Sequence, residues 1–230
     1  NLDLSSLSAA LWQMGGVFSS GRYTQRNGTF FFESRRPDRC AFCAGAVFHA
    51  HGHYPRGLWT LRNGELAKIT LANKRWLCFT CGHTVSFTPP DALRRRRACL
   101  LVIFLLLWGY LASGRGYETC GGEFLHDFAD GKKIARYLAR ARRCALPTQQ
   151  AIREVLMDKM EPEAMEEFSG GVFLRRNRSC VAGKGAPEIS SLWRALAILL
   201  IGSNTTGEAI SHLLARAHEK ALQLHRPFLL

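Results

Sequence analysis

The sequence predicts an α+β protein in which a small zinc ribbon with β-hairpins precedes a mostly α-helical C-terminal half that contains a helix-turn-helix-like unit. Three observations support this prediction. Two C-x-x-C pairs in the first half have the pattern of metal ligands. Asn-Gly dipeptides between strand-forming runs mark hairpins there. After Pro90, the apolar residues recur with helical spacing.

Turn signals dominate the first part of the chain. A short helix is expected over residues 2–14, where leucines are available for packing. Asn27-Gly28 and Asn63-Gly64 each separate two runs of strand-forming residues. Because Asn-Gly favours the tight turns that join antiparallel strands, each dipeptide predicts a β-hairpin.

The part of the chain after Pro90 reads as helical. Helices are expected over about 92–112, 131–144, 148–160, 189–201 and 205–224. The first would begin with four arginines and then become almost wholly apolar. A shorter helical stretch over 123–129 and an Asp130-Gly131 turn precede the basic helix, which Pro147 is expected to end.

These elements suggest four segments. They are an N-terminal helix and hairpin (1–36), the zinc ribbon (37–90), a basic helix-turn-helix-like domain (91–146) and a C-terminal helical region (147–230). The cysteine pattern, which is not that of a secreted disulfide scaffold, and the lack of a signal-peptide pattern at the start of the chain favour a reducing compartment such as bacterial cytoplasm or a nucleus.

Four of the eight cysteines form the predicted metal site. The expected ligands of one structural Zn²⁺ ion are Cys40, Cys43, Cys78 and Cys81. Four thiolates complete a tetrahedron and leave no position for water, so this zinc is not expected to be catalytic. Gly45 and Gly82 follow the pairs where a tight or left-handed backbone is needed. The neighbouring histidines are interpreted as surface or phosphate-contacting residues: His49, His51, His53 and His83.

Positive charge is the second strong signal. The formal net charge is +13 and the pI is about 9.8, which attracts polyanions such as nucleic acid or an anionic membrane. The arginine cluster before the apolar helix suits phosphate contacts, and helix 131–144 carries no acidic residue. The expected nucleic-acid contacts are Arg56, Arg62, Lys74, Arg75, Arg94, Arg95, Arg96, Arg97, Lys132, Lys133, Arg136, Arg140, Arg142 and Arg143.

Catalytic and membrane-spanning signals are weak. No G-x-S-x-G, H-E-x-x-H or phosphate-loop motif is present, and the acidic residues concentrate at 154–167, so an enzyme is not expected. The apolar stretch 98–112 is shorter than the roughly 20 residues that a membrane span needs. It is therefore expected to be a core or interface helix.

The cysteine-containing segment resembles a known family. The run C-A-F-C … H-G-H-Y-P-R … K-R-W-L-C-F-T-C-G-H-T-V-S-F-T-P-P is similar to the N-terminal zinc ribbon of bacterial transposases and of small proteins carried with mobile elements. The resemblance extends over residues 40–144, with A-R-Y-L-A-R-A-R-R in the position of a basic helix-turn-helix segment. It implies DNA binding and the same four zinc ligands. The catalytic acidic domain of full-length transposases is missing, so transposase activity is not implied.

The sequence therefore predicts a non-catalytic, zinc-containing nucleic-acid-binding protein. Its expected ligand is double-stranded DNA, and its expected setting is a mobile element or a bacterial antiviral defence system. An alternative is an adaptor that docks through helix 98–112 and the C-terminal helices onto a larger enzyme, such as a recombinase, reverse transcriptase or nuclease. A third hypothesis is a membrane-active effector that uses residues 94–112.

Overall fold

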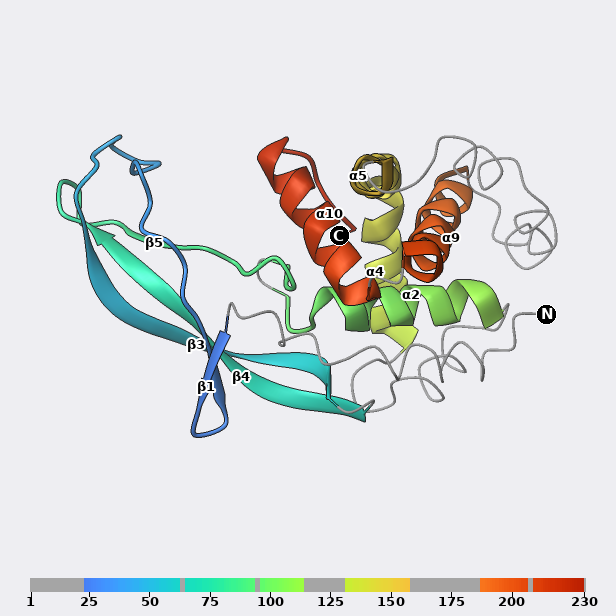
Figure 1. The fold of residues 1–230 in the computed structure, drawn as a ribbon, viewed down its shortest axis with the longest axis horizontal. Helices are drawn as coiled ribbons and strands as arrows, with labels where there is room; N and C mark the ends of the chain where they lie inside the picture. The colour runs from blue at the N-terminus through green and yellow to red at the C-terminus, as the bar shows by residue number, and fades with distance from the viewer. Residues whose placement is uncertain are drawn as a thin grey trace. The chain divides into compact units, whose positions relative to one another are not determined.

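The protein has the mixed α+β architecture that the sequence predicts, with five strands in one sheet and five helices among the described residues (Figure 1). The computed structural model describes residues 23–62, 65–93, 96–113, 131–157, 187–206 and 209–229. Their contacts divide at Cys99/Leu100 into a sheet unit and a helical unit. The expected helix over 2–14 lies outside the described residues.

The first hairpin forms where Asn27-Gly28 predicts it. Strands β1 (Tyr23–Arg26) and β2 (Thr29–Phe32) are antiparallel. Asn27 has φ 47° and Gly28 has φ 74°. Two successive positive φ values define the tight turn whose twist matches that of the flanking strands, so this prediction is confirmed.

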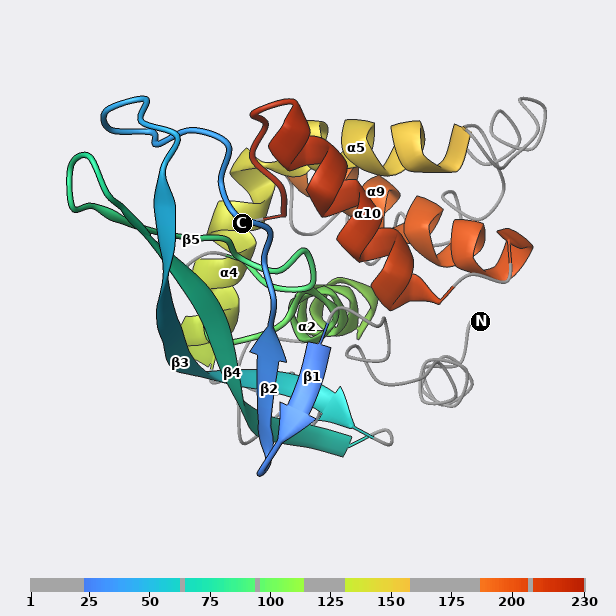
Figure 2. The ribbon, with the colours of Figure 1, turned by 60° about the vertical axis from the view of Figure 1, so that its left-hand side comes forward.

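The long hairpin forms the body of the sheet unit. Strands β3 (Phe48–Arg62) and β4 (Glu65–Cys78) pair along almost their whole length, with a bulge between Ala50 and His53. The strand order is β1-β2-β4-β3, and β5 (Thr84–Ser86) pairs with the end of β4. Strand β2 runs parallel to β4, so the first hairpin belongs to the same sheet as the cysteine-bearing strands (Figure 2).

Residues 91–99 differ from the prediction. Helix α2 (Leu100–Ser113) begins at Leu100 and not near Ala92. The backbone N–H of Trp59 donates to the carbonyl oxygen of Arg97 at 2.7 Å, and that of Cys99 donates to the carbonyl oxygen of Trp59 at 2.9 Å. Residues 97–99 do not join the helix because their backbone pairs with the edge of β3, which satisfies polar groups that a helix would otherwise satisfy internally.

The helical unit is built around α2. The remaining helices are α4 (Gly131–Arg143), α5 (Ala145–Met157), α9 (Pro187–Thr206) and α10 (Ile210–Gln223). Helix α2 packs against α4, α9 and α10, and nearly all its described side chains are buried. An all-round apolar helix is typical of a core position. Within the described part of the chain, no helix has the length and apolar character needed to cross a membrane.

Helix α4 has the predicted amphipathic pattern, whereas its boundary with α5 differs. The buried side chains of α4 are Ile134, Tyr137, Leu138 and Ala141. Pro147 does not end the preceding helix, which stops at Arg143. It lies in the first turn of α5, where proline is tolerated because the backbone N–H needs no helical partner. The expected stretch 123–129 lies outside the described residues, and the described helices do not confirm a helix-turn-helix unit.

Core packing in α5 gives a stability test with a matched control. Leu156 is fully buried and Leu146, on the same helix, is 67% exposed. We expect Leu156→Ala to lower the free energy of unfolding by about 2–5 kcal/mol because it leaves a cavity. Leu146→Ala should change it by less than about 0.5 kcal/mol. Urea unfolding followed by the helical circular-dichroism signal measures both, and equal losses would show that this packing is wrong.

Candidate metal centre

Four thiols meet at the end of the long hairpin where β3 begins and β4 ends. One pair lies in the turn before β3, and the other begins at the last residue of β4 and continues into the turn after it; Figures 1 and 2 both show these turns next to one another. The cluster consists of Cys40, Cys43, Cys78 and Cys81, whose sulfur atoms all lie within 4.8 Å of one another. The spacing predicted from sequence is therefore realised as a four-thiol cluster that could hold one metal ion.

The distances across the cluster fit a tetrahedral site. The Sγ atoms of Cys40 and Cys81 are 3.6 Å apart, and so are those of Cys43 and Cys78. Zinc–sulfur bonds of about 2.3 Å place the sulfurs of a tetrahedron roughly 3.8 Å apart. Both pairs join one sulfur of the first turn to one of the second, so an ion here would crosslink the two turns.

The two turns have matching backbone hydrogen bonds. In the first, the backbone N–H of Cys40 donates to the carbonyl oxygen of Gly45 at 2.8 Å. In the second, the backbone N–H of Cys78 donates to the carbonyl oxygen of His83 at 2.9 Å. Each bond spans five residues and closes the chain around its cysteine pair. The repeated C-x-x-C sequence therefore gives two similar local structures that face one another.

Glycine has a different role in each turn. The residue after the second cysteine has positive φ in both cases: 59° at Ala44 and 71° at Gly82. The expectation of a left-handed backbone at Gly82 is thus confirmed, whereas in the first turn this position is Ala44 and not Gly45. Gly45 is needed for close packing, because a Cβ there would lie 2.6 Å from Thr80 Oγ1.

The sulfurs have unequal proton affinities. The backbone N–H of Cys81 is the main cause that lowers the pKa of Cys78 to about 6. The backbone N–H of His83 lowers the pKa of Cys81, but burial and the three neighbouring thiols outweigh it and raise that pKa to about 12. Four adjacent sulfurs thus resist ionising together, whereas a bound cation would stabilise them as thiolates.

Little hydrophobic packing supports the turns. The buried residues beside them are Cys40, Phe48 and Cys78, with Trp76 and Val85 partly buried against them. Two of these three buried residues are candidate metal ligands. Metal coordination would therefore contribute a large share of the stability of this end of the sheet unit.

The four histidines predicted at the surface are exposed and stand outside the thiol cluster. His53 Nε2 lies 3.0 Å from Glu33 Oε1, and Lys74 Nζ donates to Glu33 Oε2 at 2.8 Å. The hydrogen bond from Lys74 is the main cause that lowers the pKa of Glu33. Lys74, a predicted nucleic-acid contact, is thus paired with a carboxylate.

The predicted basic contacts of the sheet unit differ in exposure. Arg56 is half-buried, its Nη1 donates to the carbonyl oxygen of Leu93 at 3.5 Å, and burial lowers its pKa. Arg75 donates from Nη2 to Thr84 Oγ1 at 3.1 Å. Arg97 is exposed. Arg94 and Arg95 lie outside the described residues, and Arg96 is half-buried.

The basic residues of α4 surround its buried stripe. Lys132, Arg136 and Arg143 are exposed, and Arg136 Nε donates to the carbonyl oxygen of Lys132 at 3.3 Å. The half-buried basic residues are Lys133, Arg140 and Arg142. One side of α4 thus packs into the helical unit while the exposed cations remain accessible to an anion.

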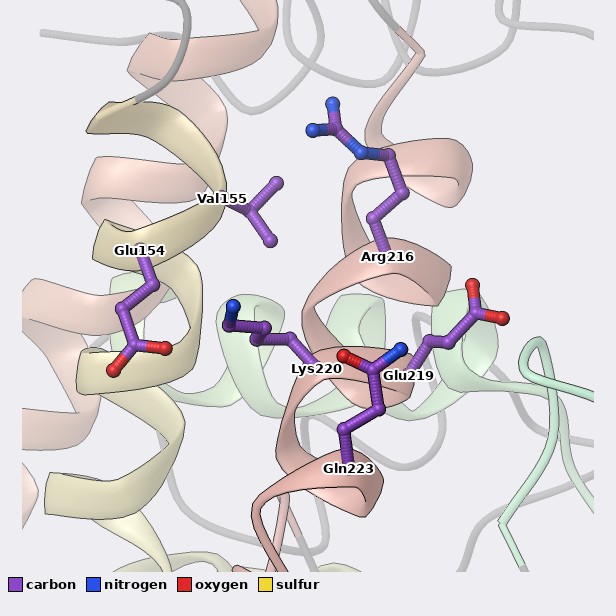
Figure 3. A pocket seen from close by; sticks show the side chains of 6 residues that line it. All are labelled: Glu154, Val155, Arg216, Glu219, Lys220 and Gln223. Atoms are coloured by element: carbon purple, nitrogen blue, oxygen red, sulfur yellow. The ribbon is translucent and has the colours of Figure 1, made fainter.

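A depression between α5 and α10 has no comparable donor set (Figure 3). Its lining residues are Glu154, Val155, Arg216, Glu219, Lys220 and Gln223. Glu154 also accepts a hydrogen bond from Arg226 at 3.1 Å. The lining charges have both signs, and the depression contains no cysteine or histidine, so the thiol cluster is the stronger candidate for a functional site.

Metal loading gives a direct test of the cluster. We expect one equivalent of Zn²⁺ or Co²⁺ per chain, and a Co²⁺ absorption spectrum with strong thiolate charge-transfer bands. Cys78→Ser should abolish stoichiometric binding because a hydroxyl is a poor ligand at a four-thiolate site. Cys144→Ala, in the turn between α4 and α5, is the matched control and should keep one equivalent. Loss of metal from both variants would contradict the assignment.

The two left-handed positions predict stability changes of opposite sign. Gly82→Ala forces a side chain into positive φ and should lower the free energy of unfolding of the metal-loaded sheet unit by about 1 kcal/mol. Ala44→Gly relieves the same strain in the other turn and should raise the free energy of unfolding by up to about 1 kcal/mol. The gain is reduced by the larger backbone entropy that glycine loses on folding. Denaturant unfolding at fixed metal concentration measures both; destabilisation by both would contradict the turn geometry.

Comparison of the chain with protein-family models, with curated proteins and with solved structures finds no match. The resemblance to transposase-type zinc ribbons thus stays a prediction from the motifs.

Proposed function

We propose that this chain is a non-catalytic nucleic-acid-binding protein whose fold is stabilised by one Zn²⁺ ion, and that its ligand is double-stranded DNA. The observation that carries the proposal is the charge of the cysteine-bearing hairpin. Between Arg39 and Pro90 the sequence contains a single acidic residue, Glu65, among many basic ones. A long hairpin with almost no carboxylates is suited to lie along a polyanion.

Zinc is the metal that the donor set favours. Four cysteines arranged as two C-x-x-C turns are typical of closed structural zinc sites, which lack an open position for substrate or water. The role of the ion would be to hold the turns together and orient the surface around them. This supports a binding function and not hydrolysis at the metal.

The exposed cations of α4 supply a second basic surface. Lys132, Arg136 and Arg143 are spread along the helix and have no carboxylate on the same helix to neutralise them. Such side chains contact phosphates, and each contact releases counterions from DNA. Binding of this kind would suit a mobile element or a bacterial defence system, the setting that the motif resemblance implies.

The adaptor alternative depends on apolar helices that remain open to a partner. Helix α2, the most apolar candidate, packs its side chains inside the helical unit. Its apolar character is therefore explained by the fold of this chain. Nucleic-acid binding is the function that the distribution of charge favours.

Binding to a short fluorescein-labelled duplex, measured by anisotropy at several salt concentrations, tests the proposal. The logarithm of affinity should fall linearly with the logarithm of salt. Arg136→Ala should flatten this slope by about 1, the contribution of one phosphate contact. Arg194→Ala removes the same charge from an exposed position on α9 and is the matched control.

Two results would count against this proposal. The absence of duplex binding by the zinc-loaded chain at low salt would exclude the function itself. If Arg136→Ala and Arg194→Ala changed the salt dependence of binding equally, α4 would contribute only through the overall electrostatic field of the protein and not through direct phosphate contacts.

A further inference from the structure

Two phenylalanines lie exposed beside the thiol cluster. Phe42 belongs to the first cysteine turn and is 66% exposed, and Phe79 belongs to the second and is 73% exposed. A single exposed apolar side chain is ordinary on a protein surface. Here, one large ring in each of two matching turns is left uncovered, so the pair needs an explanation beyond the fold of the hairpin.

Both rings are held in place by other aromatic side chains. Phe42 stacks on His83, which follows the second turn, with ring centroids 4.2 Å apart and planes 16° apart. The ring of Phe79 lies 5.7 Å from that of His49 on β3, at 66°. The backbone N–H of Phe79 also donates to the carbonyl oxygen of Val47 at 3.0 Å. These contacts orient the rings without burying them.

Basic residues outnumber acidic ones in the cysteine-bearing part of the sequence. Arg39 directly precedes the first turn and is exposed, and no acidic residue occurs in either turn or in β5. Exposed rings next to positive charge are the two components of surfaces that bind single-stranded nucleic acid, where bases stack on the rings and cations contact the phosphates. The excess of positive charge favours a polyanionic ligand over an apolar protein surface.

We propose that this aromatic tip, formed by Phe42, Phe79, His49 and His83, stacks on unpaired bases. The inference rests on the proposed nucleic-acid binding and specifies its ligand. Basic side chains contact the backbone of a duplex, while the tip binds a single-stranded segment adjoining it. The preferred ligand is then a duplex with an unpaired overhang and not a blunt duplex.

The test uses the zinc-loaded full chain and two labelled DNA probes, a blunt duplex and the same duplex with an oligo-dT overhang. The wild type should bind the overhang probe about tenfold or more tightly than the blunt one, since each stacked base contributes strongly to affinity. Phe42→Leu combined with Phe79→Leu keeps apolar side chains but removes the ring faces, and should abolish this preference. Phe87→Leu, at a 43% exposed ring outside both turns, is the matched control and should retain it.

The outcomes separate this inference from the proposed function. Binding of both probes with no preference for the overhang, or a preference that survives in the double leucine variant, overturns stacking and leaves duplex binding intact. Failure of the wild type to bind either probe overturns both. One equivalent of zinc in the double variant shows that the turns remain formed, so that a lost preference reflects the missing rings.

Discussion

The convergence of four sulfur atoms is the constraint on which the cysteine-bearing end of the sheet unit depends. The hydrogen bonds of β3 and β4 align two strands, but they do not fix the turns beyond their ends. Only a small cluster of side chains is buried beside these turns, and two of its three buried members are cysteines. The position of each exposed ring and cation around these turns follows from how the thiols are held together.

The sequence could predict the features that depend on local patterns. Asn27-Gly28 specifies its turn through the backbone preferences of two adjacent residues, and each C-x-x-C pair closes a turn within a few residues. The buried stripe of α4 follows from helical spacing alone. The four candidate ligands are predictable for the same reason, because two C-x-x-C pairs have the local spacing typical of zinc ligands.

The features that could not be predicted involve partners distant in sequence. Residues 97–99 pair with Trp59 although their composition suits the start of a helix, because an unpaired strand edge competes for their backbone groups. Arg56 has the same chemistry as an exposed arginine, and only its packing near Leu93 shows that it is half-buried. The exposure of Phe42 could not be predicted either, because it depends on how the two cysteine turns face one another.

An ion bound at the thiol cluster would also influence the parallel pairing of β2 with β4, because it lowers the entropy that is lost when the chain between these strands closes into a loop. The chain from Phe32 to its partner Asn73 forms a closed loop that includes the first cysteine turn and all of β3. A link between Cys40 and Cys81 shortens the effective loop even after β3 has paired with β4. Because closing a shorter loop loses less entropy, an ion at the cysteines would favour β2–β4 pairing by on the order of a few tenths of a kcal/mol, without contacting the residues that pair.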